Sequence, residues 1–155
     1  MAEKVWRIPA EGMKMKQPHT VPLSRQALYL LNELRTLRKA GDFLFPSICS
    51  AHCAMSDGTL NVALPRMGYG NDEMTSHGFR ATASTLLNES GLWHPDAIER
   101  ALAHGEKDRV RAAYHRGTHW AERVRMAQWW SDHLDQLRAG GKVLKGRFPS
   151  RISRK

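Results

Sequence analysis

Apolar residues at helical spacing recur through most of this chain of 155 residues. They return every three or four positions, which places them on one face of an α-helix, and a residue that commonly caps or opens a helix precedes each long run. The predicted long helices start after Ser24, after Thr75 or Ser76, at Pro95 and after Thr118, and shorter ones are predicted at 56–67 and 107–114. The glycines Gly41, Gly91 and Gly105 stand where three of these helices should end.

Two short segments with strand-like composition come before the helices. VWRIP at 5–9 and HTVPL at 19–23 flank a turn-like stretch that contains Gly12 and Pro18, a pattern that predicts a β-hairpin. The predicted fold class is therefore mainly α with a small N-terminal β-hairpin or sheet (α+β). We expect one domain over 1–137, with the hairpin at 5–23 and the helical part at 24–137, followed by a tail at 138–155.

The same spacing predicts which side chains face the core. They are Ala27, Leu28, Leu31, Leu34 and Leu37, then Phe79, Ala83, Leu86 and Leu87, and in the last helix Trp120, Val124, Ala127, Trp130, Leu134 and Leu137. Trp129 and Trp130 are adjacent, so helical geometry predicts that one face cannot bury both. One of them is a candidate partner contact, although a packed Trp beside a half-exposed one is the commoner arrangement.

Positive charge gathers at the C-terminal end. The net charge is +9, and residues 138–155 hold seven basic residues and no acidic one, which leaves 17 basic against 15 acidic residues, or +2, in 1–137. Such a tail is expected to be flexible and suited to neutralising phosphates, or alternatively to serve solubility. No apolar run could span a bilayer and no signal peptide opens the chain, so we expect a soluble cytoplasmic protein.

The two cysteines do not predict a metal site. Cys49 and Cys53 flank His52 in CSAHC, which offers at most three ligands and no second cluster to complete them. We interpret them as reduced thiols in a loop.

His77 and Arg80 lie at the start of one predicted helix. Helical geometry places both at the rim of its apolar stripe, beside backbone N–H groups that have no partner within the helix. This arrangement favours a bound phosphate. An ordinary helix-start histidine and core-edge arginine would look the same.

Tyr114 lies in a basic neighbourhood downstream of His104. The nearby cations are Lys107, Arg109, Arg111 and Arg116. Cationic surroundings favour the phenolate, which a nucleophilic tyrosine needs because its ordinary pKa is about 10. A partly buried aromatic residue is the alternative.

The order of these motifs resembles the tyrosine recombinase family, as found in phage and prophage integrases. HGFR at 77–80, LAH at 102–104 and Tyr114 match the second half of the family signature. Longer segments, WRIPAEGMKMKQPHTVPLSRQAL, FLFPS, EMTSHGFRATASTLLNESG and PDAIERALAHGEKDRVRAAYHR, are similar to integrase catalytic domains as well. The resemblance covers nearly all of residues 5–137.

The resemblance implies a reaction and a role for each matching residue. Tyr114 would attack a DNA phosphodiester to form a 3′-phosphotyrosyl link and free a 5′-hydroxyl, with no metal, nucleotide or other cofactor. Arg80 and His104 would donate hydrogen bonds to the non-bridging oxygens, and His77 would assist proton transfer or orient the tyrosine. A hairpin lysine, Lys14 with Lys16 as the substitute, would protonate the leaving oxygen. The implied DNA contacts are Lys14, Lys16, Arg80, Lys107, Arg109, Arg111 and Arg116.

The resemblance also shows two departures. The family's first catalytic arginine lies upstream of the hairpin, in a helix outside these 155 residues, and the N-terminal domain that clamps DNA is absent too. We therefore expect a C-terminal catalytic-domain fragment that binds double-stranded DNA but is catalytically deficient. The third motif reads LAH where many relatives have Gly in the middle, and Ala103 should be tolerated if its backbone is ordinary α.

Other functions fit the same residues. A non-catalytic DNA-binding remnant or a protein-interaction piece of a prophage integrase would keep this surface without the chemistry. Type IB topoisomerases use a similar set of groups, and the likeness of whole segments favours integrases. The resemblance further implies a homo-oligomer on DNA, a synaptic tetramer, in the bacterial cytoplasm near the nucleoid, with no membrane and no small-molecule substrate.

Overall fold

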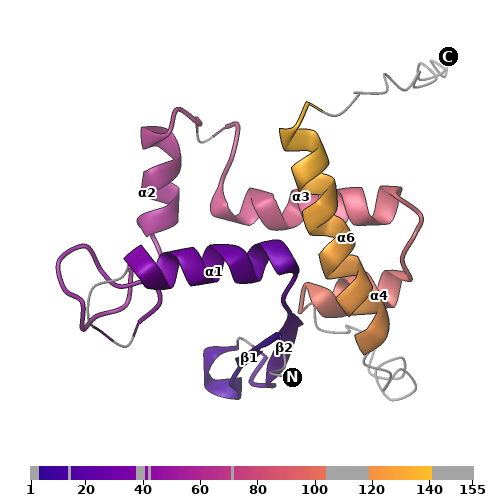
Figure 1. Cartoon of the computed structure of the whole chain (residues 1–155), viewed down its shortest axis with the longest axis horizontal. Coiled ribbons are helices and arrows are strands. Elements are labelled where there is room, and N and C mark those ends of the chain that lie inside the picture. Colours follow the sequence, from indigo (N-terminus) through magenta and orange to yellow (C-terminus); the bar gives the residue numbers. More distant parts are fainter. Residues whose placement is uncertain are drawn as a thin grey trace, which may run out of the picture.

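A computed structural model describes residues 4–13, 15–37, 41, 43–70, 72–103 and 119–140. These residues form a two-stranded antiparallel sheet followed by helices α1 (Arg25–Leu37), α2 (Thr59–Arg66), α3 (Ser76–Glu89), α4 (Pro95–Ala101) and α6 (Trp120–Arg138) (Figure 1). The predicted class, mainly α with a small N-terminal sheet, is confirmed. Within the described part, no helix is long and apolar enough to cross a bilayer.

The hairpin forms where the strand-like segments predict it. Strand β1, Val5–Ile8, pairs with β2, His19–Pro22, and the register sets Val5 opposite Pro22 and Ile8 opposite His19. A 3-10 turn at Ala10–Gly12 begins the connection. Because two strands alone are marginally stable in water, this hairpin needs the contacts with α6 described below.

Local capping chemistry starts α1 and α3 at the predicted positions. Helix α1, Arg25–Leu37, follows Ser24, whose Oγ accepts the Ala27 N–H at 3.1 Å. Helix α3, Ser76–Glu89, follows Thr75, whose Oγ1 accepts the Gly78 N–H at 3.0 Å. The other helices are α2, Thr59–Arg66, α4, Pro95–Ala101, and α6, Trp120–Arg138. Helix α4 ends at Ala101 rather than running to Gly105.

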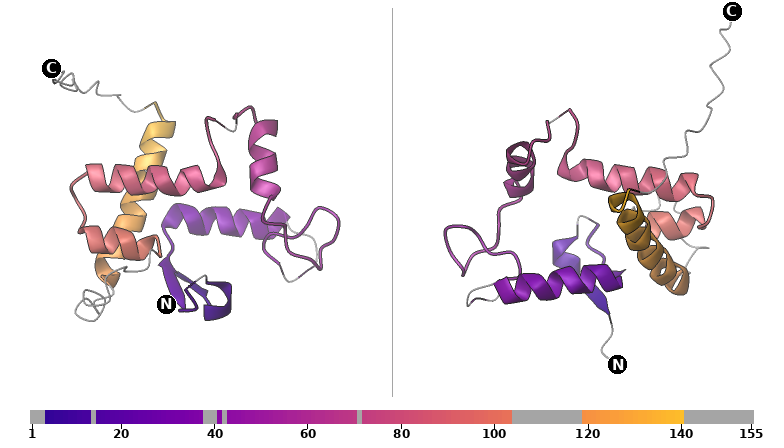
Figure 2. Two further views of the ribbon diagram at one scale, coloured as in Figure 1. Left: turned by 180° about the vertical axis from the view of Figure 1, so that it is seen from behind. Right: turned by 45° about the horizontal axis from the view of Figure 1, so that its top comes forward.

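The core lies where α6 crosses α3 and α4 (Figures 1 and 2). Its buried residues are Leu87 of α3, Ile98 of α4 and Met126 of α6. Trp129 and Trp130 both pack against this cluster but neither is fully buried, which agrees with the prediction that one face cannot bury both. Both are half-buried, and the Trp129 ring lies edge-on to Trp93 with ring centroids 5.9 Å apart.

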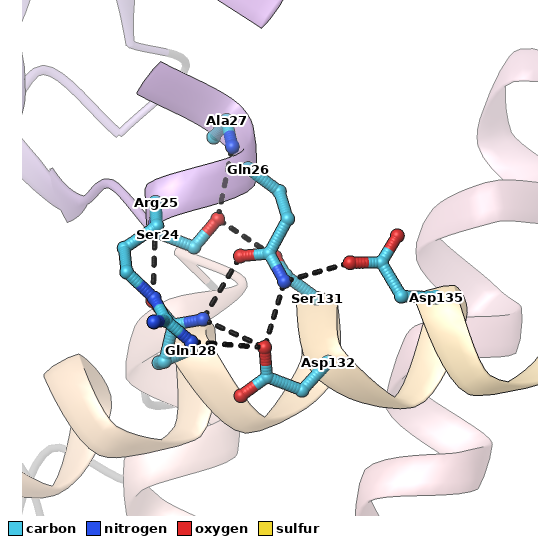
Figure 3. Close-up of polar contacts among 8 residues, drawn as sticks. All are labelled: Ser24, Arg25, Gln26, Ala27, Gln128, Ser131, Asp132 and Asp135. Carbon is cyan, nitrogen blue, oxygen red and sulfur yellow. Dashed lines mark hydrogen bonds and ion pairs between the residues drawn. The ribbon is translucent and has the colours of Figure 1, made fainter. Parts of the chain in front are cut away.

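Polar side chains join α1 to α6 (Figure 3). Gln26 donates to Asp132 Oδ1 at 2.7 Å and to Asp135 Oδ2 at 2.9 Å. Gln128 donates to the Gln26 Oε1 at 2.9 Å, and the Ser131 hydroxyl lies 2.7 Å from the Ser24 hydroxyl. The bonds from Gln26 and Gln128 hold the pKa of Asp132 below its ordinary value. No residue of α1 is buried, so these contacts at its first turn, more than apolar packing, orient the helix.

The start and the buried face of α6 differ from the prediction. His119 is the N-cap, in the left-handed region at φ 44°, whereas Thr118 lies outside the described residues. The residues buried on α6 are Arg123 and Met126. Predicted inward residues remain partly exposed: Val124 by 43%, Leu134 by 44%, Leu137 by 49%, Leu37 by 80% and Phe79 by 56%. Helical spacing identifies residues that share a face, but not whether another element covers it.

Candidate nucleic-acid interface

Helix α3 carries His77 and Arg80, the two predicted catalytic residues of the HGFR motif. The Thr75 cap fixes the start of the helix one turn before Arg80. His77 is exposed, while Arg80 is partly buried. Burial and the charge of Arg123 lower the pKa of His19 on β2, and the charge of Arg80 adds a smaller effect in the same direction.

His19 occupies a positively charged environment. Its pKa lies below the ordinary value of 6.5, first because of burial, then because of the charges of Arg123 and Arg80, while a hydrogen bond with the Ala101 backbone acts in the opposite direction. The His19 Nε2 atom is buried and has no hydrogen-bond partner within the described residues. Burial and the charges of Arg123 and Arg80 thus favour the neutral form of this imidazole.

Arg123 is a buried cation at the same place. Its side chain is 6% exposed, its Nη2 donates to the Thr20 carbonyl of β2, and its guanidinium lies 5.5 Å from the Trp120 ring centroid. No ion pair to Arg123 forms in the described part of the chain, and its Nε has no hydrogen-bond partner there. Burial and the charge of Arg100 lower its pKa. An arginine nevertheless keeps its charge, so this side chain favours an anion.

A cavity of about 1380 Å³ lies between the hairpin, the end of α4 and the first half of α6. Its basic lining residues are Lys4, Arg7, His19, Arg25, Arg100, Arg123 and Arg125. No Asp or Glu occurs among the lining residues that the structure describes. Arg25 is locally neutralised, since its Nη2 lies 3.5 Å from Asp132 Oδ1. A concave surface lined by one sign of charge focuses the field and attracts the opposite charge, here an anion.

Most of the predicted site residues lie outside the described residues. They are Lys14, His104, Lys107, Arg109, Arg111, Tyr114 and Arg116. Lys16 is exposed in the hairpin connection, with φ 52°. The convergence of His77, Arg80, His104 and Tyr114 around one phosphate thus stays a prediction.

Sequence reasoning missed His19, Arg100 and Arg123. The sequence indicated only that His19 belongs to a strand and that Arg100 belongs to an amphipathic helix. Arg123 and Arg125 follow Trp120 closely, and this clustering of cations beside an aromatic residue was the available signal. It could not reveal that Arg123 points inward.

The backbone at Ala103 is not ordinary α. Its φ is +50°, in the left-handed region, where glycine is favoured over alanine. Ala103 was expected to be tolerated if its backbone were ordinary α, and that condition is not met. This residue stands directly before His104, so the strain lies beside a predicted catalytic group.

Comparisons with known proteins agree with the motifs. A protein-family model described as "Phage integrase family" matches residues 1–119. The integrase of Enterobacteria phage P4 is 48% identical over 150 residues, which cover 88% of this chain and 34% of that protein. The prophage integrase IntA of Escherichia coli K12 is 45% identical over 139 residues, covering 90% of this chain and 33% of the relative.

The chain spans about a third of the length of these curated relatives. No solved structure matches it. The family match covers far more than half of the chain, and both relatives exceed 30% identity over most of it. This chain belongs to the phage integrase family.

Proposed function

We propose that this chain is a DNA-binding portion of a tyrosine recombinase catalytic domain and acts in site-specific integration. Support comes from membership of the phage integrase family and from relatives that are named integrases. Its partner is double-stranded DNA, and assembly of several copies on that DNA is part of the proposal. A bacterial cytoplasmic location at the nucleoid fits the same role.

The basic cavity, in whose described lining no Asp or Glu occurs, is the observation that carries the DNA-binding proposal. Arg123 is buried there without an ion-pair partner in the described residues, and His19, Arg100 and Arg125 line the same space. A phosphodiester supplies the missing negative charge and accepts charge-assisted hydrogen bonds from guanidinium groups. The charge of Arg80 on α3 also acts on His19, so the motif helix adds to the positive field of this region.

The proposed chemistry follows the family resemblance. The Tyr114 oxygen attacks phosphorus, the bond from phosphorus to the 5′-oxygen breaks, and Lys14, or Lys16 in its place, gives that oxygen a proton. Arg80 and His104 stabilise the charge on the non-bridging oxygens, and His77 assists the transfer of the tyrosine proton. Residues 107–116 and the basic tail at 138–155 add contacts to the phosphate backbone.

Residues 1–155 alone should cleave DNA poorly. The resemblance places another phosphate-binding arginine upstream of the hairpin, outside these residues. Loss of one such donor slows a reaction by roughly a hundredfold to a thousandfold. DNA binding should survive better, because many separate phosphate contacts contribute to it.

A salt titration tests DNA binding at the cavity. Fluorescence anisotropy with a labelled duplex should show that the logarithm of the binding constant falls linearly with the logarithm of the salt concentration. Arg125→Gln should make this slope shallower by about 0.9, because one phosphate contact is lost. Arg35→Gln is the matched control, since it removes the same charge from an exposed position on α1 that does not line the cavity. Equal slopes for the two variants would place the DNA elsewhere.

A nicked suicide duplex that carries the element's attachment site tests the chemistry. We expect slow formation of a covalent adduct, and none with Tyr114→Phe, whose DNA affinity should stay close to that of the unmodified chain. If no adduct forms even at long times while DNA still binds, the non-catalytic DNA-binding function is the correct one. Rapid adduct formation would instead refute the expected deficiency.

A further inference from the structure

Two imidazoles and a carboxylate meet at the N-terminal ends of α4 and α6. They belong to His94, Asp96 and His119, and one possible ligand atom from each residue lies within 4.8 Å of the other two. We propose that this cluster binds a divalent zinc-class ion. The site is separate from the basic cavity, and it does not depend on the proposed function.

Two features of the contacts around the cluster suit a metal site. His94 Nδ1 lies 3.8 Å from Asp96 Oδ2, close to the spacing of two ligands on one ion. Glu122 Oε2 lies 3.3 Å from His119 Nδ1, while its Oε1 accepts the backbone N–H of His94 at 2.8 Å. A carboxylate that holds one ring nitrogen of a histidine as N–H leaves the other nitrogen, here His119 Nε2, as the ligand.

The charge balance favours a cation despite the two helix N-termini. Each N-terminus contributes about half a positive charge, so the two together oppose an ion with about one charge. Asp96 and Glu122 at the same ends supply two negative charges. Their side chains are only 12% and 22% exposed, and that of His119 is 25% exposed, so water screens this field weakly.

The ligand set selects the kind of ion. Two imidazoles with one carboxylate form the set found in zinc sites that keep an open coordination position. Magnesium and calcium prefer sites built from oxygen ligands. The set therefore favours zinc over the two common alkaline-earth ions.

Binding requires a small rearrangement of His94. The two imidazole rings are stacked, with centroids 5.3 Å apart and planes 15° apart, and parallel rings cannot both point at one ion. The His94 side chain is 54% exposed and is free to turn, at the expense of the 3.2 Å hydrogen bond from the Asp96 N–H to its Nδ1. Once bound, the ion would link α4 to α6, the described elements on either side of residues 104–118.

Metal titration of the whole chain tests the site. The background carries Cys49→Ser and Cys53→Ser, because both thiols are exposed and would compete for zinc. After treatment with a chelator, calorimetry with zinc chloride should show one ion per chain, and zinc should raise the melting temperature. Cobalt(II) should give the visible absorption of a four-coordinate site without a thiolate band.

Substitutions locate the ion. His94→Gln and His119→Gln should each weaken zinc binding by more than about a hundredfold, and Glu122→Gln by about tenfold to a hundredfold because it acts through His119. His133→Gln is the control, since that imidazole also lies on α6 but stacks on Trp129, 5.2 Å between centroids. It should bind zinc like the background protein.

Two results would overturn the proposal. One is the absence of stoichiometric zinc binding, which would leave the cluster as a hydrogen-bonded helix cap only. The other is binding that persists in His94→Gln. His94 is largely exposed and its substitution should not prevent folding, so this variant decides the question even if His119→Gln fails to fold.

Discussion

Mild acid should destabilise the fold through His19. Burial and the charges of Arg123 and Arg80 keep the pKa of His19 below 6.5 in the folded chain, whereas the unfolded chain titrates near 6.5. Between these two values the unfolded state binds more protons than the folded state. The stability contributed by neutral His19 is therefore present above pH 6.5 and is lost as the pH falls through that value towards the folded pKa.

One such group can change the free energy of unfolding by at most about 1.4 kcal/mol per pH unit. Because the loss begins only near pH 6.5, lowering the pH from about 7.5 to about 5.5 should cost at most about 1.4 kcal/mol through His19. Urea unfolding at both pH values measures this change. The Gln amide of His19→Gln can still bond to the Ala101 backbone. In this variant the stability lost between about pH 7.5 and about pH 5.5 should be smaller by the part that comes from His19.

His52→Gln is the control, since it removes an exposed loop imidazole and should keep the pH dependence of the unmodified chain. The reasoning is refuted if His19→Gln loses as much stability on acidification as the unmodified chain does.

Three substitutions test the fold, each by urea unfolding. Ile98→Ala should destabilise the chain by about 2–5 kcal/mol, because Ile98 is fully buried between α3 and α6; a loss below about 1 kcal/mol would contradict this core. Thr75→Ala should lower the free energy of unfolding by about 1 kcal/mol because α3 loses its cap, whereas Thr75→Ser should keep most of that stability. Ala103→Gly should stabilise the chain by about 0.5–1 kcal/mol, because glycine adopts a φ of +50° without strain; destabilisation would contradict the left-handed backbone.

Local chemistry made the starts of α1, α3 and α4 predictable from sequence. Ser24, Thr75 and Pro95 act through atoms within three residues of themselves, so their effect can be read without knowledge of the fold. The end of α4 was harder to predict from the sequence. Gly105 offered a clear stop signal, but the helix already ends at Ala101, ahead of the left-handed Ala103.

Burial depends on distant parts of the chain and was predicted less well. The stripe through Val124 and Leu134 is regular, yet α3 and α4 pack on the neighbouring face at Met126. The candidate interface shows the same limit. The HGFR motif located Arg80, whereas the proximity of His19 and Arg123 depends on how the hairpin meets α6. Likewise, nothing in the sequence links His94 to His119, 25 positions apart.

Hydrogen–deuterium exchange with and without duplex DNA tests the central claim most directly, namely that DNA contacts the basic cavity between the hairpin and α6. Bound DNA should slow amide exchange in residues 15–22 and in the first turns of α6, at 120–125. Protection that appears only on α1 and α2, with the hairpin and the start of α6 unchanged, would contradict the account.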